Sequence, residues 1–139
     1  MVDKVLLVQK INKVEYHLSR VERFQQMSRE EFSQDQDAKD IVVLNLFAAI
    51  QYLIDIMTHM IADDEMGEIA FISDCADILY RNGIIDKEYR EKIKDIVGFR
   101  NIIAHQYGTI QYKIVYDVMQ NGIKDISRII RDIMDYCNL

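Results

Sequence analysis

Apolar residues recur along most of this 139-residue chain with the spacing of amphipathic helices. Near the N-terminus they recur at steps of four and three residues, which predicts a helix that ends near Met27. Roughly residues 111–136 repeat this pattern and predict a long final helix. The two apolar stripes consist of Leu7, Ile11, Val14, Leu18 and Val21, and of Val115, Met119, Ile123, Ile126, Ile130 and Ile133.

A central segment, from about Asp37 to Ala62, is apolar on most sides. This composition predicts the most buried helix of the fold. Before it, Ser28 and Glu31 have the spacing of a capping box, and Met27 and Phe32 are placed to form the hydrophobic staple that accompanies such a box. A short helical turn is therefore expected to separate the first helix from the central one.

Two further helices are predicted in the second half of the chain. One runs from about residue 68 to 81 and is followed by Asn82 and Gly83, which tolerate the left-handed conformation at a helix C-terminus. Asp86 can cap the next helix. The chain contains no proline and no strand-like alternation. The sequence thus predicts an all-α, up-and-down helical bundle of four to five long helices without β-sheet, forming a single domain over residues 1–139.

Half of the residues are apolar and 29% are charged, which is typical of a globular protein. The longest apolar stretches are interrupted by Asn45, Gln51, Asp55 and His59, so no membrane-spanning segment is expected. The N-terminus has no long apolar core and is not expected to be a signal peptide.

Two cysteines, Cys75 and Cys137, fall on apolar helix faces without metal-binding or disulfide spacing. Buried free thiols and a cytoplasmic location are therefore predicted. The net charge of −6 argues against a broad basic surface for nucleic acid. Any contact with nucleic acid is expected in a small cleft.

Candidate chemistry is concentrated in residues 100–107, which contain Arg100, Asn101, His105 and Tyr107. An arginine binds phosphate well, and a histidine exchanges protons near neutral pH. Together they suffice in principle to cleave RNA without a metal, because the nucleophile is the substrate's own 2′-hydroxyl. The structural alternatives are an ion pair of Arg100 with Asp95 or Glu91, and a helix-dipole contact for His105.

The spacing of Arg100 and His105 constrains this hypothesis. Five residues of an ideal helix turn through about 140° and rise about 7.5 Å, so the two side chains do not share a face of a straight helix. Either the helix ends near Ala104 and His105 turns back, or two copies of the motif meet across a dimer. Gly108 downstream favours a helix end.

The order arginine, four residues, histidine, one residue, tyrosine resembles the signature of the HEPN superfamily. It is most similar to the HepT-like branch, whose members are ribonuclease toxins paired with a minimal nucleotidyltransferase antitoxin, MntA. The resemblance covers roughly residues 1–137. Besides the motif, it includes the segments 45–60, 82–86 and 98–101.

This resemblance implies a homodimer with a composite cleft, an RNA substrate and an MntA-like partner. By analogy a folded RNA such as tRNA is a candidate substrate. Arg100 and His105 would be catalytic, and Asn101 would support the phosphate unless it is an ordinary exposed residue. Tyr107 would be the residue to which the antitoxin attaches AMP. Its structural alternative is a ring that packs on the end of the bundle.

Asp55 and His59 are four residues apart and share a helix face. They are predicted to contact and orient the catalytic residues as a pair, to form a polar edge of the cleft, or to be a paired polar spot beside the core. His17 is expected at the surface. No cluster has metal-ligand spacing and no cofactor motif is present in the sequence, so neither a metal nor a cofactor is expected.

Two functions of different classes follow from these observations. The first is a metal-independent endoribonuclease, the toxin of a type VII toxin–antitoxin pair, which AMPylation of the motif tyrosine neutralises. The second is a non-catalytic helical partner that presents a substrate to a nucleotidyltransferase. A helical scaffold whose arginine and histidine only cap an interface is a third interpretation.

Overall fold

The computed structural model describes residues 1–105 and 109–139, and within these ranges the chain forms helices and no strand. The predicted all-α fold is confirmed. The helices are α1 (Lys4–Glu22), α2 (Arg29–Gln34), α3 (Gln36–Asp63), α4 (Asp74–Arg81), α5 (Lys87–His105), α6 (Tyr112–Asp117) and α7 (Ile123–Cys137), and a π-helical turn, η1 (Val118–Gly122), joins α6 to α7.

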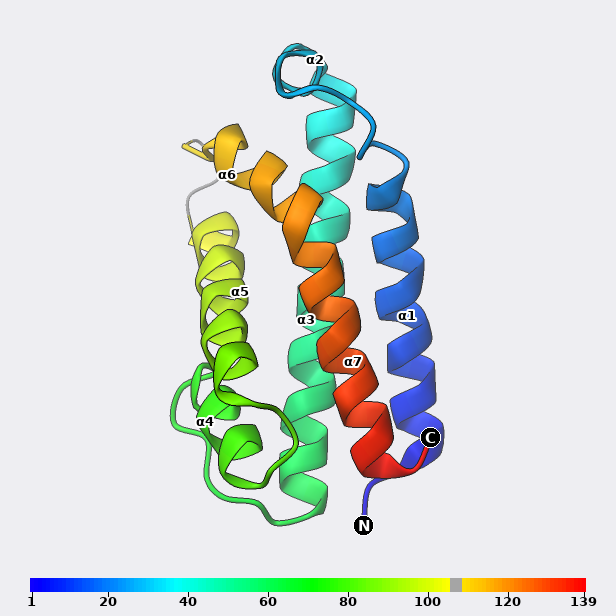
Figure 1. The fold of residues 1–139 in the computed structure, drawn as a ribbon, viewed down its shortest axis with the longest axis vertical. Helices are drawn as coiled ribbons and strands as arrows, with labels where there is room; N and C mark the ends of the chain where they lie inside the picture. The colour runs from blue at the N-terminus through cyan, green and yellow to red at the C-terminus, as the bar shows by residue number, and fades with distance from the viewer. Residues whose placement is uncertain (106–108) are drawn as a thin grey trace.

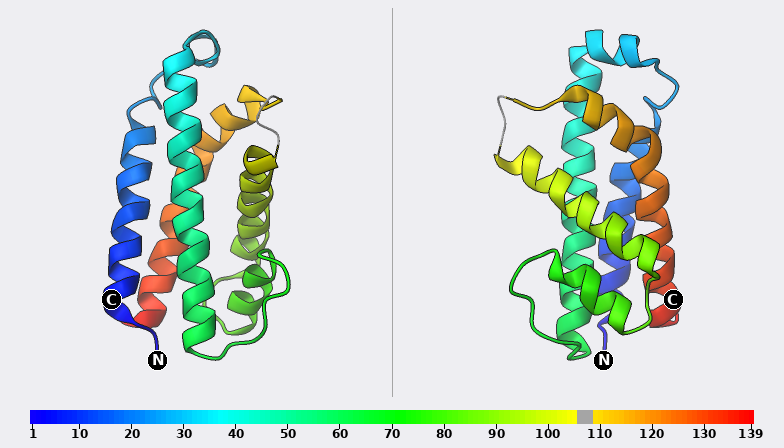
Figure 2. Two further views of the ribbon diagram at one scale, coloured as in Figure 1. Left: turned by 180° about the vertical axis from the view of Figure 1, so that it is seen from behind. Right: turned by 60° about the vertical axis from the view of Figure 1, so that its left-hand side comes forward.

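The long helices α1, α3, α5 and α7 run along the long axis of the molecule with alternating directions (Figure 1). Both chain termini lie at one end of the bundle. The C-terminal end of α5, which carries the Arg100–His105 motif, points towards the other end, near α6 (Figures 1 and 2). The up-and-down arrangement therefore places the candidate chemistry at the end of the bundle away from the termini.

The core lies where the predicted apolar stripes meet α3. Every residue of the two stripes is at most 5% exposed. The central helix α3 contributes the largest share of fully buried side chains, including Leu46, Ile50, Leu53 and Met57. Its length and apolar composition would also suit a membrane span, but half of its most apolar window is buried inside the bundle. A core helix of a bundle accounts for this composition.

The short helix α2 begins as predicted. The Ser28 hydroxyl accepts from the backbone N–H of Glu31, and the Glu31 carboxylate accepts from the backbone N–H of Ser28. The first helix, however, ends at Glu22 and not near Met27. Residues 23–27 form tighter turns in which the N–H of Phe24 bonds to Val21 and that of Met27 bonds to Phe24, so the helical ladder stops.

The prediction of a helix from residue 68 was also wrong, because α4 begins only at Asp74. The carboxylate of Asp74 accepts from the backbone N–H groups of Ala70 and Phe71, at 3.0 and 2.9 Å. This contact holds the preceding segment in a turn. The next helix, α5, begins as expected, since Asp86 accepts from the N–H of Tyr89 at 2.9 Å.

The last predicted helix is interrupted by the π-helical turn at Val118–Gly122. Gly122 is buried, and a Cβ atom at this position would lie only 2.9 Å from Cγ1 of Val118. The absence of a side chain at Gly122 therefore permits the close approach that the wider turn needs.

Candidate active site

Arg100 lies on α5 and is half-buried against α3. Its Nε and Nη2 atoms both donate to Oε1 of Gln51, at 3.2 and 2.9 Å. Its Nη1 donates to Oδ1 of the neighbouring Asn101 at 2.8 Å. All three bonds end on neutral amide oxygens. The guanidinium is thus held in place by partners that carry no charge, among the residues that the structure describes.

The predicted structural alternative, an ion pair with Asp95 or Glu91, does not form. Glu91 instead contacts Arg90 at 3.2 Å. Within residues 1–105 and 109–139, no carboxylate lies within 4.0 Å of the Arg100 guanidinium. Because a partly buried charge without a counterion is costly, this arrangement is typical of a site that receives an anion.

His105 is exposed and belongs to α5. The helix ends at His105, one residue beyond the predicted end near Ala104, and the backbone up to His105 does not form the predicted turn back towards Arg100. A helix separates two such positions by about 140° and about 7.5 Å. By this geometry the two side chains leave different faces of α5 within one copy of the chain.

Of the other two candidate residues in the motif, the structure describes Asn101 but not Tyr107. Asn101 is exposed on α5 and takes part in the site by accepting the hydrogen bond from Arg100. The predicted modification site Tyr107 lies outside the described residues, as does Gly108. The role of Tyr107 therefore stays a prediction.

Asp55 and His59 do not form the pair that their spacing suggested. Asp55 accepts from Nε2 of Gln51 at 3.3 Å and lies 3.6 Å from Nζ of Lys10 on α1. His59 is exposed on α3, and no hydrogen bond joins it to Asp55 in the described part of the chain. Asp55 thus connects to Arg100 through Gln51, whereas His59 does not join this group.

Gln51 was missed as a site residue in the sequence, although it was noted as a break in an apolar stretch. The signal that could have indicated its role was its position four residues before Asp55 on a buried helix, where polar side chains need partners. His17 was also misjudged as a surface residue. Its Nδ1 lies 2.8 Å from Oδ1 of the buried Asn45, and its ring stacks on Tyr52.

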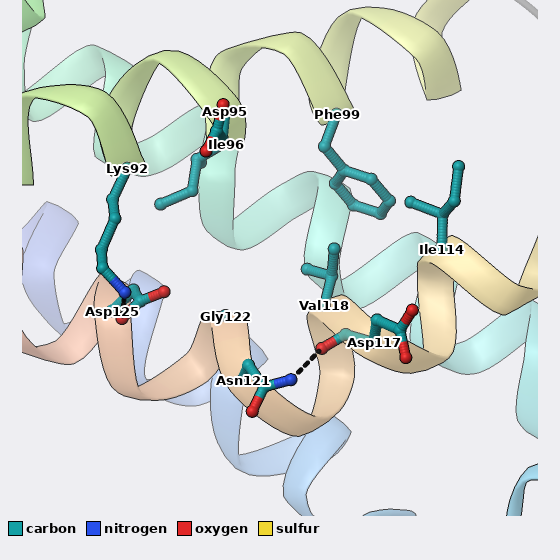
Figure 3. A pocket seen from close by; sticks show the side chains of 10 residues that line it. All are labelled: Lys92, Asp95, Ile96, Phe99, Ile114, Asp117, Val118, Asn121, Gly122 and Asp125. Atoms are coloured by element: carbon teal, nitrogen blue, oxygen red, sulfur yellow. Dashed lines mark hydrogen bonds and ion pairs between the residues drawn. The ribbon is translucent and has the colours of Figure 1, made fainter.

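Of the hollows beside α5, two lie on different faces of the helix. One, of about 550 Å³, lies beside the site and is bounded by Asn101, Gly98 and Lys94 of α5 and by the segment around Phe71. The other, of about 320 Å³, lies between α5 and the π-helical turn. There, Lys92 reaches across to Asp125 at 3.0 Å, and Phe99, Ile114 and Val118 line the other end of the hollow (Figure 3). Of these two hollows, the first includes Asn101, a partner of Arg100, in its lining.

The thiols of Cys75 and Cys137 are buried and free, as predicted. Burial is the main cause that raises the pKa of the Cys75 thiol, to about 11. This thiol is therefore protonated near neutral pH and is unsuited to act as a nucleophile. Among the residues that the structure describes, no group of three or more histidine, cysteine or carboxylate side chains has a metal-binding arrangement.

Comparison with known proteins places this geometry in a family. The family model described as "Ribonuclease HepT-like" matches residues 14–133. The chain is 30% identical over 122 residues to the mRNA nuclease HepT of Shewanella oneidensis, an alignment that covers 86% of this chain and 92% of that protein. The protein belongs to the HepT-like ribonuclease family.

Solved structures agree with this assignment. The tri-AMPylated HEPN toxin of Shewanella oneidensis, in complex with its MNT antitoxin, is 27% identical and superposes with a TM-score of 0.85, covering 97% of this chain and 99% of that one. A toxin–antitoxin structure with AMP-PNP gives a TM-score of 0.84 at 26% identity, covering 93% of this chain and 97% of that chain. The cytosolic protein YutE of Bacillus subtilis, at 16% identity, shares the fold, with a TM-score of 0.82 and coverage of 97% and 90%. The predicted HepT-like resemblance and HEPN-like fold are confirmed.

Proposed function

We propose that this HepT-like protein is a metal-independent endoribonuclease and the toxin of a type VII toxin–antitoxin pair. The observation that carries the proposal is the Arg100 guanidinium, which is held by three bonds to neutral oxygens and has no carboxylate partner among the described residues. Such a group favours a phosphate and stabilises the charge that develops on it during cleavage. Family membership identifies RNA as the source of that phosphate.

The active form in this proposal is a homodimer in which two α5 helices face each other. Four exposed positions of α5, Gly98, Asn101, Ile102 and His105, follow the spacing i, i+3, i+4 and i+7 of a helix–helix contact. Ile102 is 40% exposed, and a Cβ atom on Gly98 would meet nothing within 4 Å. An apolar residue beside a glycine on an open helix face suits close approach of a second helix.

In the shared cleft, the two copies of His105 divide the proton transfers. One imidazole takes the proton of the 2′-hydroxyl as this oxygen attacks phosphorus. The other imidazole gives a proton to the departing 5′-oxygen, so that the products are a 2′,3′-cyclic phosphate and a free 5′-hydroxyl. Positioned acid–base groups of this kind contribute about 10²–10⁴ in rate. The proposal therefore predicts a bell-shaped dependence of kcat/KM on pH.

A nucleotidyltransferase antitoxin is the proposed partner, by analogy with the complex of the Shewanella HEPN toxin with its MNT antitoxin, in which the toxin is tri-AMPylated. We propose Tyr107 as the attachment point, from the motif resemblance. Each AMP adds negative charge and bulk two residues from His105. This charge would compete with RNA for Arg100, which makes the modification an off-switch. The relative is an mRNA nuclease, while tRNA and a cytoplasmic location stay predictions for this chain.

The ribonuclease proposal is tested with purified protein, RNA and excess EDTA. The wild type is expected to cleave, and Arg100→Ala and His105→Ala are expected to lose cleavage while remaining helical and dimeric. Arg131→Ala, on the exposed side of α7, is the control and should retain activity. Cleavage by both motif variants would overturn the proposal. Absence of cleavage by the wild type would favour the non-catalytic partner interpretation.

The antitoxin proposal has a separate test. Co-expression with an MNT-type nucleotidyltransferase should raise the intact mass of the toxin by whole AMP units and abolish cleavage. Tyr107→Phe should prevent both changes and leave the protein active. AMP attached elsewhere on a Tyr107→Phe chain would contradict the assignment of the tyrosine.

A further inference from the structure

Arg100 differs from other well-placed arginines of this chain in the charge of its partners. Arg29, Arg90 and Arg128 each contact a carboxylate, at 2.8, 3.2 and 3.2 Å. The Arg100 guanidinium instead meets amide oxygens of Gln51 and Asn101. A carboxylate would orient an arginine equally well but would also neutralise it. A neutral acceptor fixes the direction of the side chain and leaves its charge for a ligand.

The orientation of the Gln51 amide is fixed by its two neighbours. An arginine only donates hydrogen bonds and a carboxylate only accepts them. Because Gln51 lies between Arg100 and Asp55, its oxygen must face the guanidinium and its nitrogen must face the carboxylate, as the structure has it. Asp55 is balanced in turn by Lys10, whose side chain is only 18% exposed. Polar contacts therefore connect Arg100 on α5, through Gln51 and Asp55 on α3, to Lys10 on α1.

The remaining donors of Arg100 suit a phosphate. A guanidinium has five N–H groups. Three of them are used, one on each nitrogen, by the bonds to Gln51 and Asn101. The other two N–H groups, one on Nη1 and one on Nη2, have no acceptor among residues 1–105 and 109–139. Two N–H groups on neighbouring nitrogens match two oxygens of one phosphate.

We propose that Gln51 is a positioning residue of the ribonuclease, a role that rests on the proposed function. It holds Arg100 with a neutral acceptor so that the full positive charge and two N–H groups reach the scissile phosphate. The Asp55–Lys10 pair keeps the Gln51 amide from turning over. Gln51 itself contacts neither substrate nor the reacting atoms.

Two substitutions separate orientation from charge. Gln51→Leu removes the acceptor but leaves Arg100 charged, so kcat should fall about 100-fold, the size typical of losing one aligned transition-state donor. RNA binding should keep its salt dependence. Gln51→Glu keeps an acceptor but pairs the Arg100 guanidinium with a carboxylate. This variant should therefore lower kcat, and its RNA complex should have one phosphate contact fewer than that of the wild type. Asp55→Asn permits the amide to turn over and should lower kcat about tenfold.

The binding measurement uses an RNA oligonucleotide whose 2′-hydroxyls are methylated and which therefore cannot be cleaved. The logarithm of its Kd is measured against the logarithm of salt concentration. For single-stranded RNA each lost phosphate contact reduces this slope by about 0.7. Gln51→Glu should reduce the slope by this amount, as Arg100→Ala should, whereas Gln51→Leu should not. Gln36→Glu, which adds the same charge at the exposed start of α3, is the matched control and should leave kcat and slope near wild type.

The outcomes distinguish this proposal from the proposed function. Wild-type protein that does not cleave RNA overturns the function and with it the role of Gln51. Wild-type cleavage combined with normal kcat for both Gln51 variants overturns only the role of Gln51. A merely structural role predicts loss of helical signal and an equal effect of both variants on the slope, which would also contradict the proposal. If either Gln51 variant fails to fold, the Asp55→Asn kcat decides, and a value equal to wild type overturns the proposal.

Discussion

Gly98 occupies the middle of α5, on the exposed face that we assign to the contact between two copies. A Cβ atom added at Gly98 would have no neighbouring atom of the described residues within 4 Å. In the monomer, Gly98→Ala should therefore raise the free energy of unfolding, because alanine in a helix interior is about 0.8–1.0 kcal/mol more favourable than glycine. With an unfolding entropy of roughly 2.1 cal/mol/K per residue, a chain of 139 residues should gain about 3 °C in Tm.

Gly98→Leu should give a similar gain to the single copy but should separate the two α5 helices. A side chain forced into a filled contact costs about 1–3 kcal/mol, which corresponds to roughly 5- to 150-fold weaker self-association. The measurements are thermal unfolding of dilute protein, sedimentation velocity, and RNA cleavage at the same concentrations. Asn12→Leu on the exposed side of α1 is the control for an added surface leucine and should leave the dimer intact. A Gly98→Leu protein that is dimeric and fully active would refute the assigned interface.

Three further predictions test other parts of the structure. Arg100→Lys should retain RNA binding but lower kcat about 100-fold in steady-state assays, because lysine has no pair of N–H groups to align, and a loss below tenfold would contradict this. Gly122→Ala should lower the free energy of unfolding by about 1 kcal/mol through its clash with Val118, and Val118→Ala should reverse this loss in a double-mutant cycle by urea unfolding. The Tyr136 hydroxyl, 2.6 Å from Asp64, is the main cause that lowers the pKa of this carboxyl, so Tyr136→Phe should raise that pKa in an NMR titration. A carboxyl whose pKa is lower in the folded than in the unfolded state stabilises the fold at pH values above its unfolded pKa, and this stabilisation is lost as the pH falls. Tyr136→Phe should therefore lower the free energy of unfolding more at pH 7 than near pH 3, and equal losses at both pH values would contradict the assignment.

The helices could be predicted from the sequence because burial imposes a local period. The stripe from Leu7 to Val21 and the one from Val115 to Ile133 repeat at helical spacing, and all their members are buried. The capping box at Ser28 and the cap at Asp86 were equally local. The start of α4 could not be predicted in this way. The Asp74 carboxylate accepts from the backbone N–H groups of Ala70 and Phe71, and these bonds hold in a turn a segment whose apolar residues are spaced like those of a helix.

The candidate site was predicted only as far as its residues are neighbours in the chain. Arg100, Asn101 and His105 lie within one motif, so their chemistry was visible in the sequence. Gln51 is 49 residues away from Arg100, and only the packing of α5 on α3 brings them together. For the same reason the contact of His17 with Asn45, 28 residues apart, was missed.

The claim on which this account most depends is that one cleft uses His105 from both copies of the chain. Wild-type and His105→Ala protein, carrying different tags, are mixed at varied ratios and allowed to exchange subunits, and mixed dimers are verified by tandem purification. RNA cleavage should then fall with the square of the wild-type fraction, because only dimers with two histidines have both an acid and a base. Activity in direct proportion to the wild-type fraction would contradict a cleft that needs both histidines.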